Sequence, residues 1–437
     1  MRFERNDDGY EQARRATVWN ARRPDRFPDT VVQATSDEDV VAAVNAARER
    51  GQRIGVRSGG HSWAANHVRD GGLLLDVKAL DEVIVDPDTM TATVGPGCYG
   101  NDLLEQLRTH GLFFPAGHCV GVGIGGYLLQ GGYGWNGRAL GPACASVEAI
   151  DVVTAQGELV RADATQNSDL LWAARGSGPG FFGVVTRFHV KLHPRPKVIA
   201  NGVYLYPHEH LDEVFRWAHA IGPDVPPSME LMLVVHRDAN DDIEVAVTGP
   251  VFADSAEEAT ETLQLLGTCP VADRATLAVP EIPAEMTDLY AGVHAAYPDE
   301  HRYDVDNMWT HAAIDDLLPG LNAIADSMPD APSHMLWMNW SPASGPPRPD
   351  MAYSCEDDTY IACYGVWSDP ANDARNERWA TDNMRAMEPL ATGIQLADEN
   401  LGRRPARFMS DANMARLDEL RAEHDPDGVF HPWMGRL

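Results

Sequence analysis

Two side chains that can form covalent bonds stand in glycine-rich runs of this 437-residue chain. His61 lies in Arg-Ser-Gly-Gly-His-Ser (57–62), and Cys119 lies in Pro-Ala-Gly-His-Cys-Val-Gly-Val-Gly-Ile-Gly-Gly (115–126). Glycine clusters let a backbone approach a polyanionic cofactor closely and direct its N–H groups at it. An imidazole and a thiol held in such loops could therefore bond covalently to that cofactor. The alternative for Cys119 is a thiol that only packs in the core.

The second run also satisfies the pattern G-x-G-x-x-G, from Gly121 to Gly126. In dinucleotide-binding folds this pattern must open a helix. Nine glycines lie between Gly121 and Gly141, and we expect no helix to begin among them because glycine is a poor helix former. The run is therefore predicted to be an extended loop lying along a cofactor. Neither a G-x-S-x-G nucleophile motif nor a set of metal ligands at suitable spacing is evident, so we expect no metal site.

The composition of the chain excludes several classes of protein function. With 437 residues and 44% apolar content, the chain is predicted to be globular with two domains. The net charge of −30 repels nucleic acid and anionic membranes, and we expect neither as a partner. Six scattered cysteines predict no disulfide framework. The N-terminus shows no apolar signal segment and no apolar run approaches a membrane span, which predicts a cytoplasmic protein.

The hydrophobic pattern changes near the proline-bounded stretch 193–197. Before it, Ser36 is expected to cap a helix over 35–50. The other elements predicted there are strands over 53–57, 73–77, 82–85, 91–94 and 181–192, a helix over 101–109, and a hairpin of 149–154 with 158–161. After the stretch, alternating strands over 229–236, 243–252, 335–340 and 360–367 accompany helices over 255–267, 311–327 and 370–388. This half is predicted to be an α+β domain.

Several motifs follow the two glycine runs in a fixed order. They include Gly-Pro-Gly (95–97), Gly-Gly-Tyr-Gly (131–134), Asp-Leu-Leu-Trp (169–172), Gly-Val-Val-Thr (183–186) and Asp-Pro-Asp-Gly-Val-Phe (425–430). The series resembles the bacterial berberine bridge enzyme-like FAD-linked oxidases, which belong to the vanillyl-alcohol oxidase-type FAD-binding superfamily. The resemblance covers essentially the whole chain and is strongest over residues 50–190.

This resemblance implies an α+β fold in which the FAD-binding domain has two parts. Residues 1–197 would form the first part, and residues 398–437 a C-terminal return to it. Residues 198–397 would form a substrate-binding domain with an antiparallel sheet.

The resemblance also implies a bicovalently bound FAD. His61 would bond to the 8α-methyl group of the flavin, and Cys119 to its C6 position. The remaining cofactor-binding residues would be Arg57, Ser58, Gly59, Gly60 and Ser62 at the pyrophosphate, Val122, Gly123, Gly125 and Gly126 along the flavin, and Gly183 and Val185 at the adenine end.

The predicted function is that of an FAD-dependent oxidoreductase. We expect an oxidase that takes hydride from a C–H bond of an alcohol, amine or phenolic small molecule, with O2 as acceptor giving H2O2. In the family, a valine at the position of Val122 accompanies oxidase behaviour and a bulkier residue accompanies dehydrogenase behaviour. A flavin dehydrogenase with a non-oxygen acceptor and a catalytically reduced flavin- or ligand-binding protein are the alternatives. The protein is expected to be a monomer or a homodimer.

The catalytic base does not follow from the family pattern. Many relatives carry Tyr-x-Asn-Tyr before the C-terminal segment, and its last tyrosine takes the substrate proton. Here the aligned residue is Leu396, which cannot accept a proton. The replacement candidates are Tyr127, Asn339 and Tyr353, and a tyrosine base needs its pKa lowered from about 10. Further candidates around the substrate are Trp337, Tyr360, Tyr364 and His118.

Overall fold

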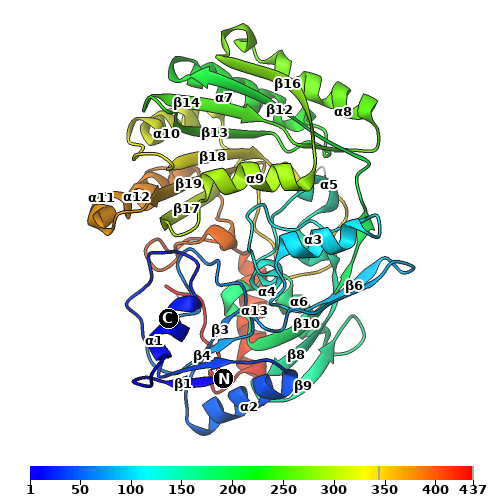
Figure 1. The fold of residues 1–437 in the computed structure, drawn as a ribbon, viewed down its shortest axis with the longest axis vertical. Coiled ribbons are helices and arrows are strands. Elements are labelled where there is room, and N and C mark those ends of the chain that lie inside the picture. The colour runs from blue at the N-terminus through cyan, green and yellow to red at the C-terminus, as the bar shows by residue number, and fades with distance from the viewer. Residues whose placement is uncertain (343–344, 436–437) are drawn as a thin grey trace.

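Two hydrophobic cores organise the chain in the computed structural model, which describes residues 1–342 and 345–435. One core is built mainly from residues within 34–192 and 394–433, and the other from residues within 200–387. The larger part of the first core thus comes from the two ends of the chain, and the second core from its middle. The domain boundaries at 197 and 398 stay predictions. In Figure 1 the first part lies below and contains both marked ends of the chain, and the second part lies above it.

The lower part is built around two sheets. A four-stranded sheet has the order β1-β2-β4-β3, in which β2 and β3 both run parallel to β4. A five-stranded antiparallel sheet has the order β5-β6-β10-β8-β9. The strands are β1 (Arg2–Glu4), β2 (Thr30–Gln33), β3 (Ile54–Arg57), β4 (Leu73–Asp76), β5 (Val83–Asp86), β6 (Thr91–Val94), β8 (Val147–Thr154), β9 (Leu159–Ala162) and β10 (Gly183–Lys191), with a separate pair of β7 (Leu112–Phe113) and β11 (His193–Pro194).

Helices surround these sheets. The described helices of this part are α1 (Tyr10–Ala16), α2 (Asp37–Glu49), α3 (Gly100–Arg108), α4 (Ile124–Leu129), α5 (Gly137–Leu140), α6 (Ser168–Ala174) and α13 (Asp411–His424). The predicted helix over 35–50 is confirmed as α2, and the Ser36 side chain accepts a hydrogen bond from the backbone N–H of Asp39 as expected for an N-cap.

The expectation that no helix begins in the glycine run is wrong, because α4 starts at Ile124 and α5 lies further along the run. Tertiary contacts offset the low helix propensity of glycine at α4. The Ser58 hydroxyl accepts from the N–H of Gly126, and the Pro96 carbonyl accepts from the N–H of Gly125. A side chain at Gly125 would lie 2.7 Å from the Pro96 Cβ, so this helix start needs a glycine.

The upper part is an eight-stranded antiparallel sheet with the order β15-β12-β14-β13-β18-β19-β17, and β16 pairs with β12. Its strands are β12 (Val198–Pro207), β13 (Met232–Arg237), β14 (Ile243–Thr248), β15 (Val251–Ala253), β16 (Leu277–Ala284), β17 (Arg302–Thr310), β18 (His334–Asn339) and β19 (Thr359–Trp367). Its described helices are α7 (Leu211–Ile221), α8 (Ala256–Leu263), α9 (Met286–Ala296), α10 (Ile314–Asp326), α11 (Asp373–Asn376) and α12 (Trp379–Ala386). The predicted antiparallel sheet and the α+β class are confirmed.

The two faces of this sheet have different neighbours. Alternate side chains of a strand point to opposite faces. On β19, Ile361 and Cys363 belong to the core shared with α7, α10 and α12, whereas Tyr360, Ala362 and Tyr364 belong to an aromatic cluster with Trp63 of the lower part. One face of the sheet therefore packs against helices, and the other faces the lower part of the molecule.

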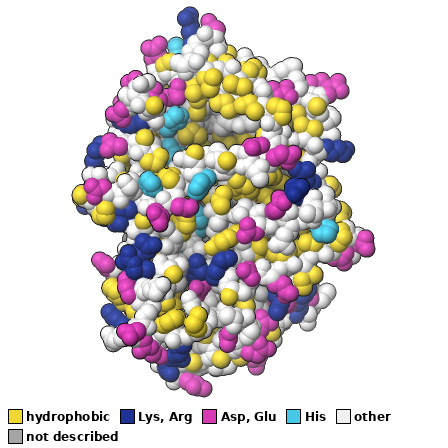
Figure 2. Space-filling view, viewed as in Figure 1, with side chains coloured by type: hydrophobic (Ala, Val, Ile, Leu, Met, Phe, Trp, Pro, Cys, Tyr) yellow, Lys and Arg dark blue, Asp and Glu magenta, His cyan; other side chains and the backbone are white. Residues whose placement is uncertain are grey.

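Charged side chains are scattered over the surface of the molecule (Figure 2). Acidic and basic side chains are spread over the face seen in Figure 2, and hydrophobic side chains gather in the upper part of the same view. The exposed large hydrophobic residues include Leu277 and Ile282 on β16, which are 45% and 39% exposed. Within the described part of the chain, none of the helices is long and apolar enough to cross a membrane.

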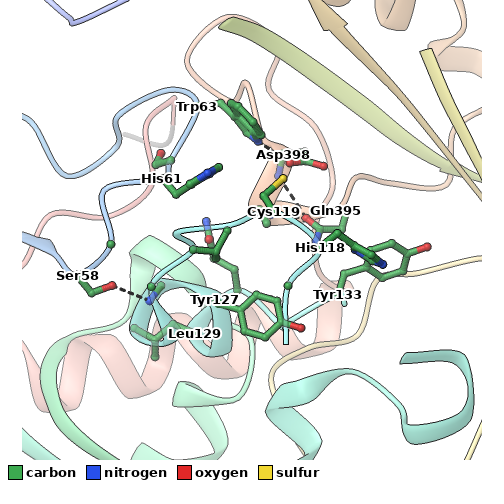
Figure 3. A pocket seen from close by; sticks show the side chains of 18 of the residues that line it. Ser58, His61, Trp63, His118, Cys119, Tyr127, Leu129, Tyr133, Gln395 and Asp398 are labelled. Carbon is green, nitrogen blue, oxygen red and sulfur yellow. Dashed lines mark hydrogen bonds between the residues drawn. The ribbon is translucent and has the colours of Figure 1, made fainter. Parts of the chain in front are cut away.

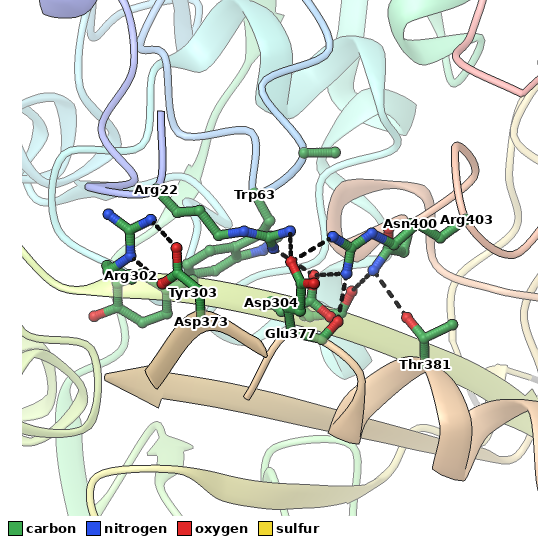
Figure 4. Close-up of polar contacts among 12 residues, drawn as sticks. Arg22, Trp63, Arg302, Tyr303, Asp304, Asp373, Glu377, Thr381, Asn400 and Arg403 are labelled. Carbon is green, nitrogen blue, oxygen red and sulfur yellow. Dashed lines mark hydrogen bonds and ion pairs between the residues drawn. The ribbon is translucent and has the colours of Figure 1, made fainter. Parts of the chain in front are cut away.

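Ion pairs join the two parts near the end of the upper sheet. Asp304 on β17 lies between Arg22 of the N-terminal segment, at 2.7 Å, and Arg403 of the C-terminal return, at 3.2 Å, and both arginines also contact Glu377 (Figure 4). Nearby, Arg404 and Asp306 form a pair at 2.6 Å with side chains only 4% and 1% exposed. Three distant segments of the chain are thus fixed against one another.

Arg404→Met is expected to lower the free energy of unfolding by about 3–5 kcal/mol, because it leaves the Asp306 carboxylate buried without its partner. Arg375→Met, in a solvent-exposed pair with Asp330, is the matched control and is expected to cost about 1 kcal/mol or less. Urea unfolding of the two variants measures the difference. Equal losses in both would contradict the importance of the buried pair.

Candidate cofactor and substrate site

A cavity of about 520 Å³ lies between the lower part and the upper sheet. This volume falls within the range of about 300–1,000 Å³ that is typical of ligand pockets. Both glycine-rich runs line it, together with residues of β10 and of the strands β13, β18 and β19. The cavity therefore brings together the two glycine-rich runs that carry His61 and Cys119.

The two runs touch through their backbones. A Cβ atom added to Gly59 would lie 2.4 Å from the backbone nitrogen of Gly123, and one added to Gly123 would lie 2.4 Å from the nitrogen of Gly59. Only glycine at both positions allows this approach. The contact explains why residues sixty positions apart in sequence share one cavity.

Hydrogen bonds fix the second run on neighbouring elements. The Asn101 side-chain carbonyl accepts from the N–H of Gly121, and the carbonyl of Cys98 accepts from the N–H of Ile124. The Ser58 hydroxyl, in the first run, accepts from the N–H of Gly126 at 3.1 Å. These bonds hold Cys119 and Val122 in a defined position against the first run.

His61 is a half-buried, neutral ring. It stacks on Trp19 with ring centroids 4.2 Å apart, and Trp63 meets it edge-on. Burial lowers the pKa of His61 to about 4, so the imidazole is uncharged at neutral pH. Its Nε2 atom is buried without a hydrogen-bond partner in the described residues. Because buried polar atoms usually have a hydrogen-bond partner, this unpaired nitrogen indicates a place where a bound molecule could contact the ring.

Cys119 points into the same part of the cavity as His61 (Figure 3). Burial raises the pKa of its thiol well above the ordinary value, and the nearby Asp398 carboxylate raises it further. The thiol is therefore protonated at neutral pH in this environment, and the sulfur lies close enough to Asp398 to respond to its charge.

All the other residues predicted to bind the cofactor also line the cavity. They are Arg57, Ser58, Gly59, Gly60, Ser62, Val122, Gly123, Gly125, Gly126, Gly183 and Val185. Arg57 already has hydrogen-bond partners within the protein. Its guanidinium donates to Asp76 at 2.8 Å and to the carbonyl of Gly59 at 3.1 Å, so it shapes the loop with a charge that Asp76 already balances.

The geometry does not support Asn339 as a catalytic residue. Asn339 lies on the helix-facing side of β18, where its amide donates to the carbonyl of Ala218 on α7 and its carbonyl accepts from the Trp337 indole. Trp337 belongs to the same helix-side core. Both residues thus face away from the cavity.

The two tyrosine candidates are also unsuited to accept a proton from a bound molecule. Tyr353 is buried outside the cavity lining, and its hydroxyl donates to Glu356. Tyr127 lines the cavity with its ring, but its hydroxyl donates to the carbonyl of Pro115 and points away from His61 and Cys119 (Figure 3). Burial raises the pKa of both hydroxyls well above the usual value, the opposite of what a base requires.

The polar group that the sequence did not single out is Asp398. Its Oδ2 atom accepts hydrogen bonds from Tyr360 at 2.5 Å and Tyr364 at 2.8 Å, and its Oδ1 atom accepts from the Trp63 indole at 2.6 Å. The spacing of Tyr360 and Tyr364, four residues apart on one strand, places them on the same face and is a signal readable from the sequence. The position of Asp398, two residues after Leu396, has no such local signal.

His118, the neighbour of Cys119, also lines the cavity and contacts Glu230 at 3.0 Å. Glu230 is 1% exposed and accepts a second bond, from the backbone N–H of Asn136. The buried carboxylate thus orients the His118 ring.

Comparison with known proteins gives this arrangement a family. Residues 28–163 match the family described as an FAD binding domain. The chain is 32% identical over 438 residues to the FAD-linked oxidoreductase nodO of Hypoxylon pulicicidum, covering 95% of this chain and 93% of that protein. The chain belongs to the family of FAD-linked oxidoreductases. It is also 28% identical, over 98% of its length and 95% of the relative's, to the uncharacterized FAD-linked oxidoreductase YvdP of Bacillus subtilis.

Solved structures confirm the vanillyl-alcohol oxidase-type fold. The 6-hydroxy-D-nicotine oxidase of Arthrobacter nicotinovorans superposes with a TM-score of 0.86 at 20% identity, covering 99% of this chain and 96% of that one. The berberine bridge enzyme-like protein 1 of Physcomitrella patens gives 0.84 at 19% identity, covering 100% and 97%. The grass pollen allergen Phl p 4, a glucose dehydrogenase, gives 0.82 at 19% identity over 99% and 96%, and its variant with one isoleucine replaced by valine is a glucose oxidase.

The residues of the cavity fit FAD. Both glycine-rich runs line the cavity, and the unpartnered Nε2 atom of His61 offers a bonding position there. The chain is thus an FAD-linked oxidoreductase, and both glycine runs line the cavity that fits its cofactor.

Gly59→Ala is expected to reduce FAD content and to lower the free energy of unfolding by about 3 kcal/mol, because the new Cβ would collide with the backbone of Gly123. Gly292→Ala in α9 is the control, since a Cβ there meets no atom within 4 Å. The flavin-to-protein absorbance ratio and the thermal midpoint measure both effects. Full flavin content in Gly59→Ala would show that the loop contact is dispensable.

Proposed function

We propose that this protein is an oxidase with bicovalently bound FAD that oxidises a small molecule bearing an alcohol, amine or phenol group. FAD supplies the acceptor for the hydride taken from the substrate C–H bond. The chain supplies the binding site, the orientation of the substrate and the handling of its proton. The observation that carries the proposal is the neutral, unpartnered His61 ring facing the same cavity as Cys119.

In this proposal, residues 1–197 and 398–437 form the FAD-binding domain, and residues 198–397 form the substrate-binding domain. His61 bonds to the 8α-methyl group and Cys119 to C6 of the flavin. The amides of Ser58 to Ser62 cradle the pyrophosphate, and Gly183 and Val185 flank the adenine. Two tethers suit a protein of net charge −30, whose overall field repels a dianionic pyrophosphate. The cytoplasmic location and the oligomeric state stay predictions from the sequence.

Acid precipitation followed by intact mass tests the tethers. The yellow colour is expected to stay with the precipitate, with a mass increase of one FAD. Cys119→Ala should keep the colour through His61, and Cys119→Ala with His61→Ala should release it. Cys98→Ala, at a buried cysteine outside the cavity, is the control and should change neither result. Colour that leaves the unaltered protein with the supernatant would refute covalent attachment, while noncovalent FAD binding would stand.

Val122 supports the choice of O2 as acceptor. It lines the cavity in the run that carries Cys119, and its backbone is fixed by the bond from the N–H of Gly100 to its carbonyl. Phl p 4 gives a precedent in this fold. The protein is a glucose dehydrogenase, and its variant with one isoleucine replaced by valine is a glucose oxidase.

Val122→Ile is expected to slow the reoxidation of reduced flavin by O2 about tenfold, equivalent to about 1.4 kcal/mol of barrier, because the added methylene narrows the path to the ring. Stopped-flow absorbance after dithionite reduction measures the rate without a substrate. Val85→Ile, on β5 away from the cavity, is the control. Slow reoxidation of the unaltered protein, with rapid reoxidation by a quinone, would favour the dehydrogenase.

A further inference from the structure

The floor of the substrate side of the cavity is one face of three adjacent strands. Met232 and Val234 on β13 pair in register with Met338 and Leu336 on β18, and all four side chains line the cavity. These residues have no hydrogen-bonding group beyond a weak thioether acceptor. The centre of the floor is therefore apolar.

Aromatic rings form the end of the floor next to the glycine runs. His334 and Tyr364 stack with centroids 4.9 Å apart, and Tyr297 meets both edge-on. Burial lowers the pKa of His334 to about 4, so this ring is neutral and adds no positive charge. Trp63, whose ring centroid lies 5.9 Å from that of Tyr364, and Tyr133 also line the cavity. The rings suit a flat, apolar molecule.

Asp398 is the charged group at this end. A carboxylate has about four acceptor positions, and the bonds from Tyr360, Tyr364 and Trp63 occupy three of them. The two tyrosines share Oδ2, so a position remains on Oδ1. Asp398 is only half-buried and lines the cavity close to Cys119, as Figure 3 shows.

Most other polar groups around the floor already have partners within the protein. The Tyr133 hydroxyl contacts the Met338 sulfur, and the Asn201 side-chain carbonyl accepts from the Thr248 hydroxyl. The Gln395 side-chain carbonyl accepts from the N–H groups of Ala397 and Asp398. A polyol such as a sugar would leave many of its hydroxyls unpaired here, at a cost for each.

The charge of the lining also has one sign. Among the described residues, the sheet side of the cavity contains no lysine or arginine, whereas Asp398 and, on α9, Asp288 line it. A bound anion would face Asp398 with no opposite charge beside it. Like charges brought together in this way oppose binding.

We infer that the substrate is an apolar, ring-containing molecule with one hydroxyl or protonated amine, and that Asp398 holds this group through its free acceptor position. The inference rests on the proposed function, because it places the reacting group near the tethered edge of the flavin. It makes Asp398 the residue that selects neutral and cationic substrates over anions and sugars.

Three probes with the same ring system test the inference on the FAD-loaded protein. They are 2-naphthylmethylamine, 2-naphthalenemethanol and 2-naphthylacetate, with glucose as the polyol. Titration followed by the visible absorbance of the flavin gives each dissociation constant. The amine and the alcohol are expected to bind at least about tenfold more tightly than the acetate, a difference of about 1.4 kcal/mol. Glucose is expected to leave the spectrum unchanged.

Asp398→Asn keeps the size of the side chain and removes its charge. The variant is expected to bind the amine about tenfold more weakly and the acetate more tightly, with little change for the alcohol and with unchanged flavin content. Asp288→Asn, at an exposed carboxylate of the same cavity, is the matched control and should keep the selectivity of the unaltered protein.

Tight binding of the acetate or of glucose by the unaltered protein would overturn the inference, as would unchanged selectivity in Asp398→Asn. The first comparison needs no variant and so holds even if Asp398→Asn fails to fold. A protein that contains no FAD would instead refute the proposed function.

Discussion

The backbone contact between Gly59 and Gly123 is the constraint on which the site depends. At this point two segments of chain come so close that a single methyl group on either one would strike a peptide nitrogen of the other. The contact fixes the separation between the loop that carries His61 and the loop that carries Cys119. The bond from the Gly126 N–H to Ser58 is a further contact between the two loops, and the bond from the Gly121 N–H to Asn101 holds the second loop on α3. A flat cofactor that meets both side chains needs this closeness, because neither loop alone surrounds it.

The second constraint is that the sheet of the upper part packs against helices on one face and against the lower part on the other. Its helix-side face is filled by a conventional apolar core, and this leaves the opposite face free to carry chemistry. Two residues from other segments pack against that face. They are Trp63, which directly follows the first glycine run, and Asp398 of the C-terminal return. The ion pairs of Asp304 and Asp306 with arginines of the terminal segments hold these contributions in place. Stability and site geometry thus depend on the same inter-part contacts.

The sequence was most informative where local rules decide the structure. The Ser36 cap, the hairpin of β8 and β9 and the two glycine runs all depend on neighbours in sequence, and the structure has them. It was least informative for β18 and β19, since strands buried on both faces show no polar alternation that would tell which residues face the cavity. The sequence therefore gives no guide to the orientation of Asn339, which faces α7, whereas Tyr360 and Tyr364 face Asp398. Tyr353 lies outside both strands, where its pattern predicts no orientation. The sequence does not predict α4 for a related reason. The acceptors for its first N–H groups are Ser58 and the Pro96 carbonyl, which lie far away in sequence.

Electrostatics connect the cofactor side and the substrate side of the cavity. On the cofactor side, Arg57 is balanced by Asp76 and His61 is neutral, whereas Arg69 also lines the cavity and donates to oxygens of Asn66 and Pro432. Backbone amides and, in our proposal, covalent bonds can hold a dianion there without a favourable net field. Among the described residues, no lysine or arginine lines the sheet side of the cavity, where Asp398 is held by hydroxyl and indole donors. An acidic protein that holds its cofactor without using long-range attraction can keep an acidic substrate cavity beside it. Because three of the acceptor positions of Asp398 are already occupied, a substrate with a single polar group satisfies the cavity better than one with many.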